Sequence, residues 1–103
     1  MEFLYKLTAA RPDMLNIGPT EAELQIIQEH TEYLSNLSTS GSIILYGRTQ
    51  VNDERSFGLV IFKAATETEA RKLMTNDPAV SKGIMNAELH PYKIEFLNRQ
   101  YHD

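Results

Sequence analysis

The stretch FGLVIF at residues 57–62 decides the fold, because it predicts a strand that is apolar on both faces. Side chains alternate between the two faces of a strand, so Leu59 and Ile61 point to one face and Val60 and Phe62 to the other. A sheet with one face in water alternates apolar and polar residues instead. Both faces of this strand must therefore be covered.

Three more strands are predicted around this stretch. They cover residues 3–7, residues 42–46, which are also apolar on both faces, and residues from about 85 to 96. Pro91 marks a bulge or an edge position in the last of them. Residues 8–19 contain two prolines and a glycine without a clear period, which predicts a long loop of the kind often used for binding or as a lid.

Two capping boxes predict where helices begin. Thr20 with Glu23 opens a first helix, which Gly41 ends. Thr66 with Glu69 opens a second, shorter helix. The elements therefore follow the order β-α-β-β-α-β.

This order predicts an α+β, ferredoxin-like domain over residues 1–103 with an antiparallel sheet, and a frayed tail at residues 98–103. Both helices lie on one face of such a sheet, and the other face remains bare. A second copy in a two-fold dimer is the most economical cover for an apolar face. A ligand, single-stranded nucleic acid and a partly exposed face remain as alternatives.

Composition narrows the function classes. Ten Lys and Arg against 14 Asp and Glu give a net charge of −4, which argues against a nucleic-acid backbone as the main partner. The absence of cysteine excludes disulfides, thiolate nucleophiles and cysteine metal sites. No apolar run has the length of a membrane span and no secretory signal is apparent, so we expect a cytoplasmic protein.

His30 is the most informative single residue. It falls on the apolar stripe of the first helix, which Leu24, Ile27, Leu34 and Leu37 define, so it points toward the sheet. A histidine there is either a general acid or base or a core residue with a satisfied hydrogen bond.

Asp77 precedes Pro78, a pair typical of the N-cap and first residue of a short helix, which Gly83 would end. The alternative role for Asp77 is a carboxylate that orients His30. Sequence spacing alone does not show that the two side chains meet.

Arg48, after Gly47, and Arg11, in the long loop, are candidates to bind an anionic substrate through bidentate contacts, although surface arginines are common. His90 and His102 lack the spacing of a metal site, so we expect no metal. No sequence motif requires a cofactor.

Residues 55–62 partly match an RNA-binding strand signature. However, Ser56 replaces its glycine and Leu59 replaces an aromatic residue that would stack on a base. RNA binding requires Phe57 and Tyr5 to be exposed on an open sheet, and we rank it third among the functions considered.

Six short motifs, in matching order and spacing, together resemble the YciI-like (YCII-related) family. They are RPDM at residues 11–14, GPT at 18–20, HTEYL at 30–34, LYGRT at 45–49, DPAVSKGIM at 77–85 and ELHPYKI at 88–94.

The resemblance implies a dimeric α+β barrel, in which two ferredoxin-like subunits pack sheet against sheet, similar to muconolactone isomerase and antibiotic-synthesis monooxygenase barrels. One branch of the family is linked to dechlorination of an aromatic ring, and a histidine–aspartate dyad has been proposed. His30 and Asp77 match a histidine and an aspartate of the family motifs. Gly47 is kept, but Arg48 replaces the usual proline.

We therefore expect a small homodimeric enzyme in which His30 acts as general acid or base and Asp77 orients it. Arg11 or Arg48 would bind an acidic or phenolic group. Lyase, isomerase or dehalogenase chemistry on a small ring compound fits this arrangement. The alternative is a dimer of the same build that binds a small molecule, or serves as an accessory subunit, without catalysis.

Overall fold

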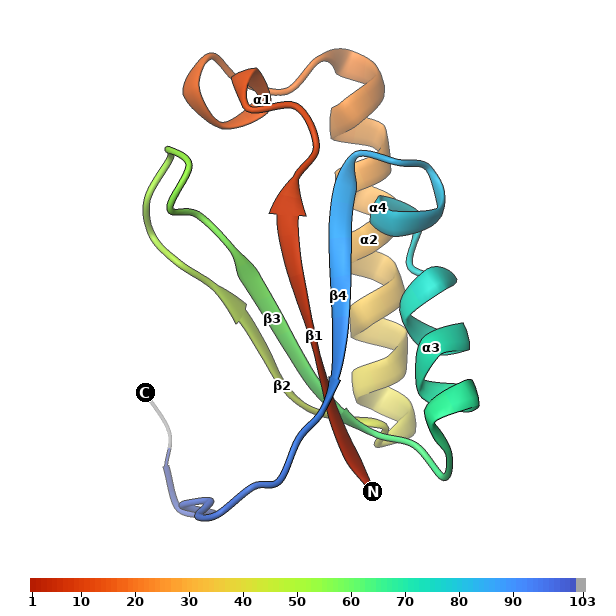
Figure 1. Cartoon of the computed structure of the whole chain (residues 1–103). Coiled ribbons are helices and arrows are strands. Elements are labelled where there is room, and N and C mark those ends of the chain that lie inside the picture. The colour runs from red at the N-terminus through yellow and green to blue at the C-terminus, as the bar shows by residue number, and fades with distance from the viewer. Residues whose placement is uncertain (102–103) are drawn as a thin grey trace.

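The computed structural model describes residues 1–101, which contain four strands and four helical segments (Figure 1). His102 and the end of the tail expected at 98–103 lie outside the described residues. The elements are β1 (Glu2–Ala9), α1 (Asp13–Asn16), α2 (Glu21–Ser40), β2 (Ile43–Arg48), β3 (Gly58–Lys63), α3 (Glu67–Thr75), α4 (Pro78–Ser81) and β4 (Met85–Pro91).

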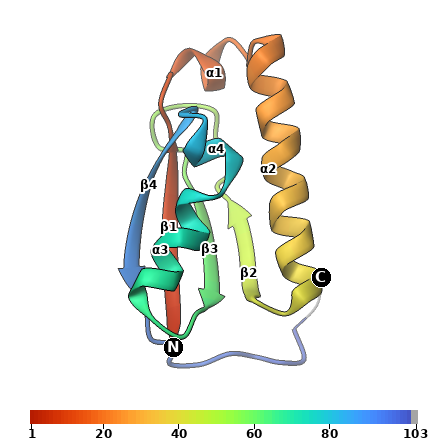
Figure 2. The same ribbon diagram turned by 90° about the vertical axis from the view of Figure 1, so that its right-hand side faces the viewer.

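The strands form one antiparallel sheet in the order β2-β3-β1-β4. Helices α2, α3 and α4 all cover the same face of it (Figures 1 and 2). This is the ferredoxin-like α+β arrangement predicted from the order of elements.

Helix α2 begins and ends where the sequence predicts. The Thr20 hydroxyl accepts a hydrogen bond from the Glu23 amide at 3.1 Å, and the Glu23 carboxylate accepts one from the Thr20 amide at 2.8 Å. Gly41 ends the helix with a φ of 87°, a left-handed conformation that favours glycine. One residue of the predicted apolar stripe differs, since Leu24 is 54% exposed while Leu34 is buried.

The prediction of a loop over residues 8–19 is wrong at two points. Strand β1 extends to Ala9, and residues 13–16 form the single helical turn α1, whose Met14 is buried. One turn is too short to show a helical period in the sequence. Strand β4 is shorter than predicted and ends at Pro91, on the edge strand of the sheet.

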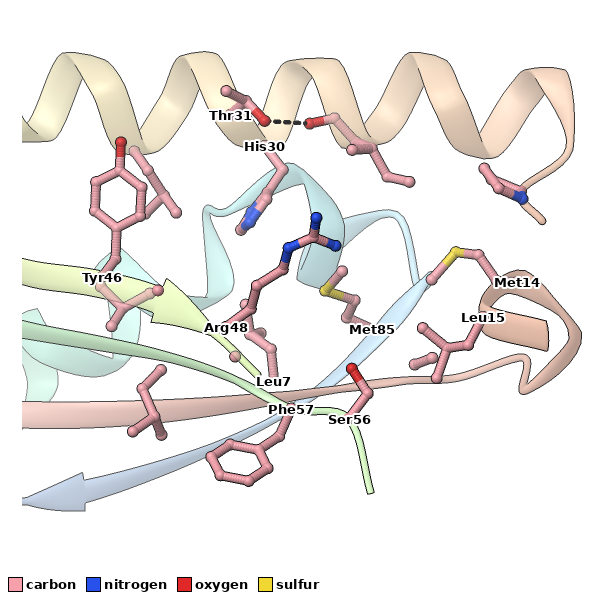
Figure 3. Close-up of a pocket in the computed structure, with 18 of the residues that line it drawn as sticks. Leu7, Met14, Leu15, His30, Thr31, Tyr46, Arg48, Ser56, Phe57 and Met85 are labelled. Atoms are coloured by element: carbon pink, nitrogen blue, oxygen red, sulfur yellow. Dashed lines mark hydrogen bonds between the residues drawn. The ribbon is translucent and has the colours of Figure 1, made fainter. Parts of the chain in front are cut away.

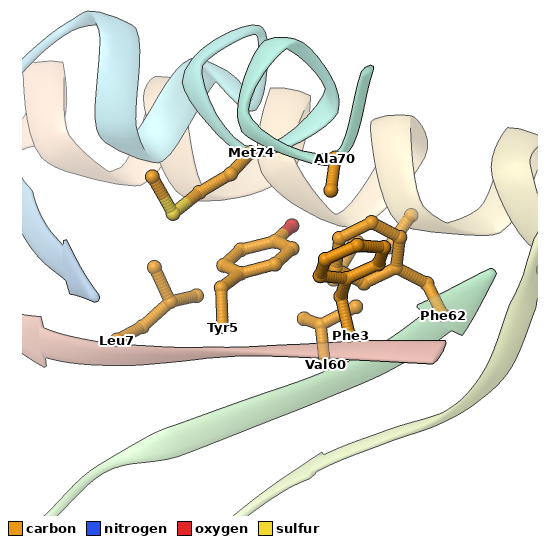
Figure 4. Close-up of a cluster of buried hydrophobic side chains, with 8 residues drawn as sticks. Phe3, Tyr5, Leu7, Val60, Phe62, Ala70 and Met74 are labelled. Carbon is orange, nitrogen blue, oxygen red and sulfur yellow. The ribbon is translucent and has the colours of Figure 1, made fainter. Parts of the chain in front are cut away.

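The core lies between the sheet and the helices (Figure 4). Alternate residues of β1, namely Phe3, Tyr5 and Leu7, point into it. The rings of Tyr5 and Phe62 pack edge to face, with 5.7 Å between the ring centres. Tyr5 is therefore fully buried beneath the helices. RNA binding would require Tyr5 to be exposed on an open sheet, and the structure shows that it is not.

We call the face of the sheet that points away from the helices the outer face. It carries Leu4, Leu45, Leu59 and Ile61, which the pairing register places side by side across β1, β2 and β3. Leu45 is 47% exposed, whereas Ile61 is buried within the single chain. Strands β2 and β3 are thus apolar on both faces, as predicted, and helices cover only one of these faces.

Within residues 1–101, no helix combines the length and the apolar character needed to cross a membrane.

Candidate functional site

A cavity of about 680 Å³ opens between α2, the α1 segment and the ends of β2 and β3 (Figure 3). Its volume lies in the range of pockets that hold small organic ligands, roughly 300–1,000 Å³. Mostly apolar side chains line it, together with a few polar ones from α2 and from the β2–β3 connection. Phe57 contributes to the rim, but its ring points to the outer face, where the Lys6 ammonium lies 5.0 Å from the ring centre.

His30 reaches this cavity from the middle of α2. Its position on the stripe that faces the sheet was predicted, and its side chain is 15% exposed and lines the cavity. Nδ1 lies 2.7 Å and 2.9 Å from the two carboxylate oxygens of Asp77. The structure thus brings together two residues that are 47 positions apart in the chain.

Asp77 is fully buried, and hydrogen bonds hold its carboxylate from three directions. Oδ1 accepts from the Ala79 amide at 3.0 Å, so Asp77 is the N-cap of α4, as predicted. Oδ2 accepts from the Tyr5 hydroxyl at 2.8 Å, and His30 completes the set. A buried charge requires such partners, because an unpaired carboxylate away from water is strongly unfavourable.

Tyr5 is a site residue that sequence reasoning missed. Its burial, together with the nearby charge of Asp77, raises the pKa of the Tyr5 hydroxyl, so the hydroxyl remains a donor. Burial and Asp77 also raise the pKa of Tyr33, whose hydroxyl donates to the Leu73 carbonyl at 2.6 Å. The sequence did contain one signal for this role. A tyrosine on the helix-facing side of β1 has its hydroxyl buried, and a buried hydroxyl needs a hydrogen-bond partner.

The contact with Asp77 determines which histidine nitrogen meets a ligand. A carboxylate accepts hydrogen bonds, so Nδ1 of His30 donates to Asp77, and the lone pair of the neutral imidazole is on Nε2. Nε2 has no partner within residues 1–101, and no buried side-chain nitrogen there lacks one, so Nε2 is open to the cavity. This arrangement can take up a proton at Nε2 while Asp77 stabilises the resulting imidazolium.

The two predicted arginines have different surroundings. Arg11 donates from Nε and Nη2 to the Glu23 carboxylate at 2.9 Å and 2.5 Å, and from Nη2 to the Gly18 carbonyl at 3.2 Å. It is not among the residues that line the cavity, whereas Arg48 is. Figure 3 shows the Arg48 guanidinium extending from β2 toward the His30 ring.

Across residues 1–101, no three His, Asp or Glu side chains are grouped so that they could hold a metal ion.

The chain belongs to the family of YCII-related domains, whose family model matches residues 1–92. Its fold is similar to that of 5-chloro-2-hydroxyhydroquinone dehydrochlorinase from Burkholderia phenoliruptrix AC1100, solved in complex with 2,5-dihydroxybenzoquinone. The TM-score is 0.67 and the identity 22%, over 90% of this chain and 94% of that one. No curated protein matches the chain significantly.

Proposed function

We propose that this protein is an enzyme that moves a proton on a small ring compound, with His30 as general acid and base. One observation carries the proposal. The Nδ1 atom of His30 is hydrogen-bonded to the carboxylate of the fully buried Asp77, while Nε2 is open to a cavity large enough for a ring compound.

The chemistry follows from the state of the two nitrogens. Nε2 removes a proton from a ring hydroxyl or from a carbon next to a carbonyl, and Asp77 stabilises the imidazolium. Return of the proton to another position gives isomerisation. Departure of a halide as the proton leaves gives net loss of a hydrogen halide. The dehydrochlorinase with a similar fold is named for the removal of hydrogen chloride from a ring compound, which supports the latter reaction class.

The working unit in this proposal is a homodimer. The apolar residues of the outer face support it, because a second copy of the same sheet would cover them. A cytoplasmic location remains a prediction from sequence.

The test is turnover in D₂O with a panel of cyclic hydroxy and oxo compounds that includes 5-chloro-2-hydroxyhydroquinone. Proton NMR detects exchange or rearrangement, and an ion electrode detects chloride. We expect wild-type turnover and a loss in kcat of roughly 100-fold or more in His30→Gln, the range typical of a lost general acid or base. Asp77→Asn, which keeps an N-cap residue, should also lower kcat.

Thr31→Ala is the matched control, since Thr31 also lines the cavity from α2 but its hydroxyl donates to the Ile27 carbonyl of the same helix. Turnover that persists in folded His30→Gln contradicts the proposal. Tight ligand binding without turnover by the wild-type protein indicates instead a dimer that binds small molecules without catalysis.

A further inference from the structure

The cavity lining combines an apolar set and a polar set of side chains. The apolar set includes Leu7, Met14, Leu15, Ile27, Leu34 and Met85 from β1, α1, α2 and β4. The polar set includes Arg48, Asn52 and Ser56 from β2 and the β2–β3 connection, and Figure 3 shows Arg48 reaching into the cavity beside Met85. A ligand that fits this lining carries an apolar body and a polar group.

Charge makes this lining selective. Among residues 1–101, no Asp, Glu or Lys lines the cavity, and Arg48 is the one permanently charged side chain on its lining. The chain as a whole carries a net charge of −4. The cavity thus presents a positive group in a protein that is negative overall, and an anion entering it meets no carboxylate among the described lining residues.

Arg48 is also available to a ligand. Its side chain makes no hydrogen bond and no ion pair with any other residue in the range 1–101, whereas the side chains of Arg11 and Arg55 are bound to Glu23 and Asp53. The register of β2 places Arg48 opposite Gly58, and its side chain lies on the helix side of the sheet beside His30 (Figure 3). A guanidinium binds a carboxylate or phenolate through two parallel hydrogen bonds.

We infer that the cavity selects small ring compounds that carry one anionic oxygen group, with Arg48 as the residue that determines this specificity. The ring packs on the apolar side chains of the lining, and the anionic group pairs with Arg48. The part of the ring next to that group then faces Nε2 of His30. The inference rests on the proposed function for the role of His30, but the preference for anions does not depend on catalysis.

Calorimetric titration tests the inference with two ligands of nearly the same size and shape, 2-hydroxybenzoate and 2-hydroxybenzamide. We expect the wild-type protein to bind the anionic acid at least about tenfold more tightly than the neutral amide. Arg48→Gln should weaken binding of the acid by roughly 10- to 100-fold, as expected for a lost charged hydrogen-bonding partner, and should leave binding of the amide unchanged. Acetate, which lacks the ring, should bind more weakly than 2-hydroxybenzoate.

Arg71→Gln is the matched control, because it removes the same charge from α3, outside the cavity lining. Equal binding of acid and amide, no binding of either at millimolar concentration, or equal effects of Arg48→Gln and Arg71→Gln would overturn the inference. A preference for the acid with no effect of His30→Gln on turnover contradicts the proposed function and leaves the anion site standing.

Discussion

Asp77 has both a structural role, as the N-cap of α4, and a role in the proposed chemistry, as the partner of His30. One carboxylate caps α4 through the Ala79 amide and accepts hydrogen bonds from Tyr5 and His30. The cap fixes the carboxylate on a short helix, and Tyr5 holds it from the centre of the sheet. The imidazole of His30 is therefore oriented by a group that is itself rigid, which favours one tautomer, with the proton on Nδ1 and Nε2 facing the cavity.

The hydroxyl of Tyr5 should contribute measurably to stability. Tyr5→Phe keeps the buried ring but removes the donor to Asp77, and a hydrogen bond to a charged group is worth about 1.5–3 kcal/mol. We expect the free energy of unfolding in urea to fall by about that amount. Tyr33→Phe, which loses a bond to the neutral Leu73 carbonyl, should lose only about 0.5–1.5 kcal/mol. An equal or larger loss in Tyr33→Phe would contradict this account.

At the residue scale, helical spacing was enough to predict the direction of His30, because the positions of Ile27 and Leu34 define the sheet-facing side of α2. The contact with Asp77 was not predictable, since it depends on how α4 packs against α2. The sequence offered a cap and an orienting carboxylate as alternatives for Asp77. The structure shows the cap and the contact with His30 together.

At the scale of elements, the segment before α2 forms part of the cavity and is fixed to that helix. Met14, Leu15 and Gly18 line the cavity, and Arg11 joins their segment to Glu23 in the first turn of α2. The Glu23 carboxylate also accepts the Thr20 amide, so one side chain holds both the helix start and the cavity wall.

Acid should release this connection. The Arg11 guanidinium, helped by the Thr20 amide, lowers the pKa of Glu23 from 4.5 to about 2. A lowered folded-state pKa adds stability that is fully present above about pH 4.5 and is lost as the pH falls toward about 2. Thermal unfolding followed by circular dichroism measures this effect. We expect Glu23→Gln to have a lower unfolding temperature than wild type at pH 7, and we expect this difference to disappear by pH 2.

Glu21→Gln is the control for this titration. Glu21 lies in the same turn and makes no ion pair with any described residue. A gap of constant size between wild type and Glu23→Gln across this pH range would show that the ion pair does not contribute to stability.

The elements that sequence predicted best were those with paired local signals. Thr20 with Glu23, and Thr66 with Glu69, marked helix starts that the structure confirms. α1 was missed because a single turn has neither a period nor a capping box. The end of β4 was missed because the last pairing, from the Tyr92 amide to the Glu2 carbonyl, depends on where the neighbouring strand begins.

At the scale of the whole molecule, two apolar features lie on the side away from the helices. One is the outer face, with Leu4, Leu45, Leu59 and Ile61. The other is the segment after β4, which leaves the sheet on that side (Figure 1) and carries Phe96 at 82% and Tyr101 at 76% exposure. Apolar residues grouped in this way are typical of a protein interface.

A second copy of the chain would cover both features, so we predict a dimer of twice 11.8 kDa in light scattering on a sizing column. Leu45→Glu tests which face is used, because Leu45 is 47% exposed in a single chain and the change should leave the fold intact. A buried, unpaired carboxylate at the interface would be strongly unfavourable, and we expect Leu45→Glu to run as a monomer at micromolar concentration.

Leu24→Glu is the matched control, since Leu24 is similarly exposed, at 54%, but lies on α2, on the other side of the sheet from Leu45. A dimer that Leu24→Glu disrupts and Leu45→Glu does not would place the interface on the helices. A wild-type protein that stays monomeric at every concentration would mean that the outer face remains open in solution. In either case the sheet-to-sheet dimer would be rejected, while the fold of the single chain and the contact between His30 and Asp77 would stand.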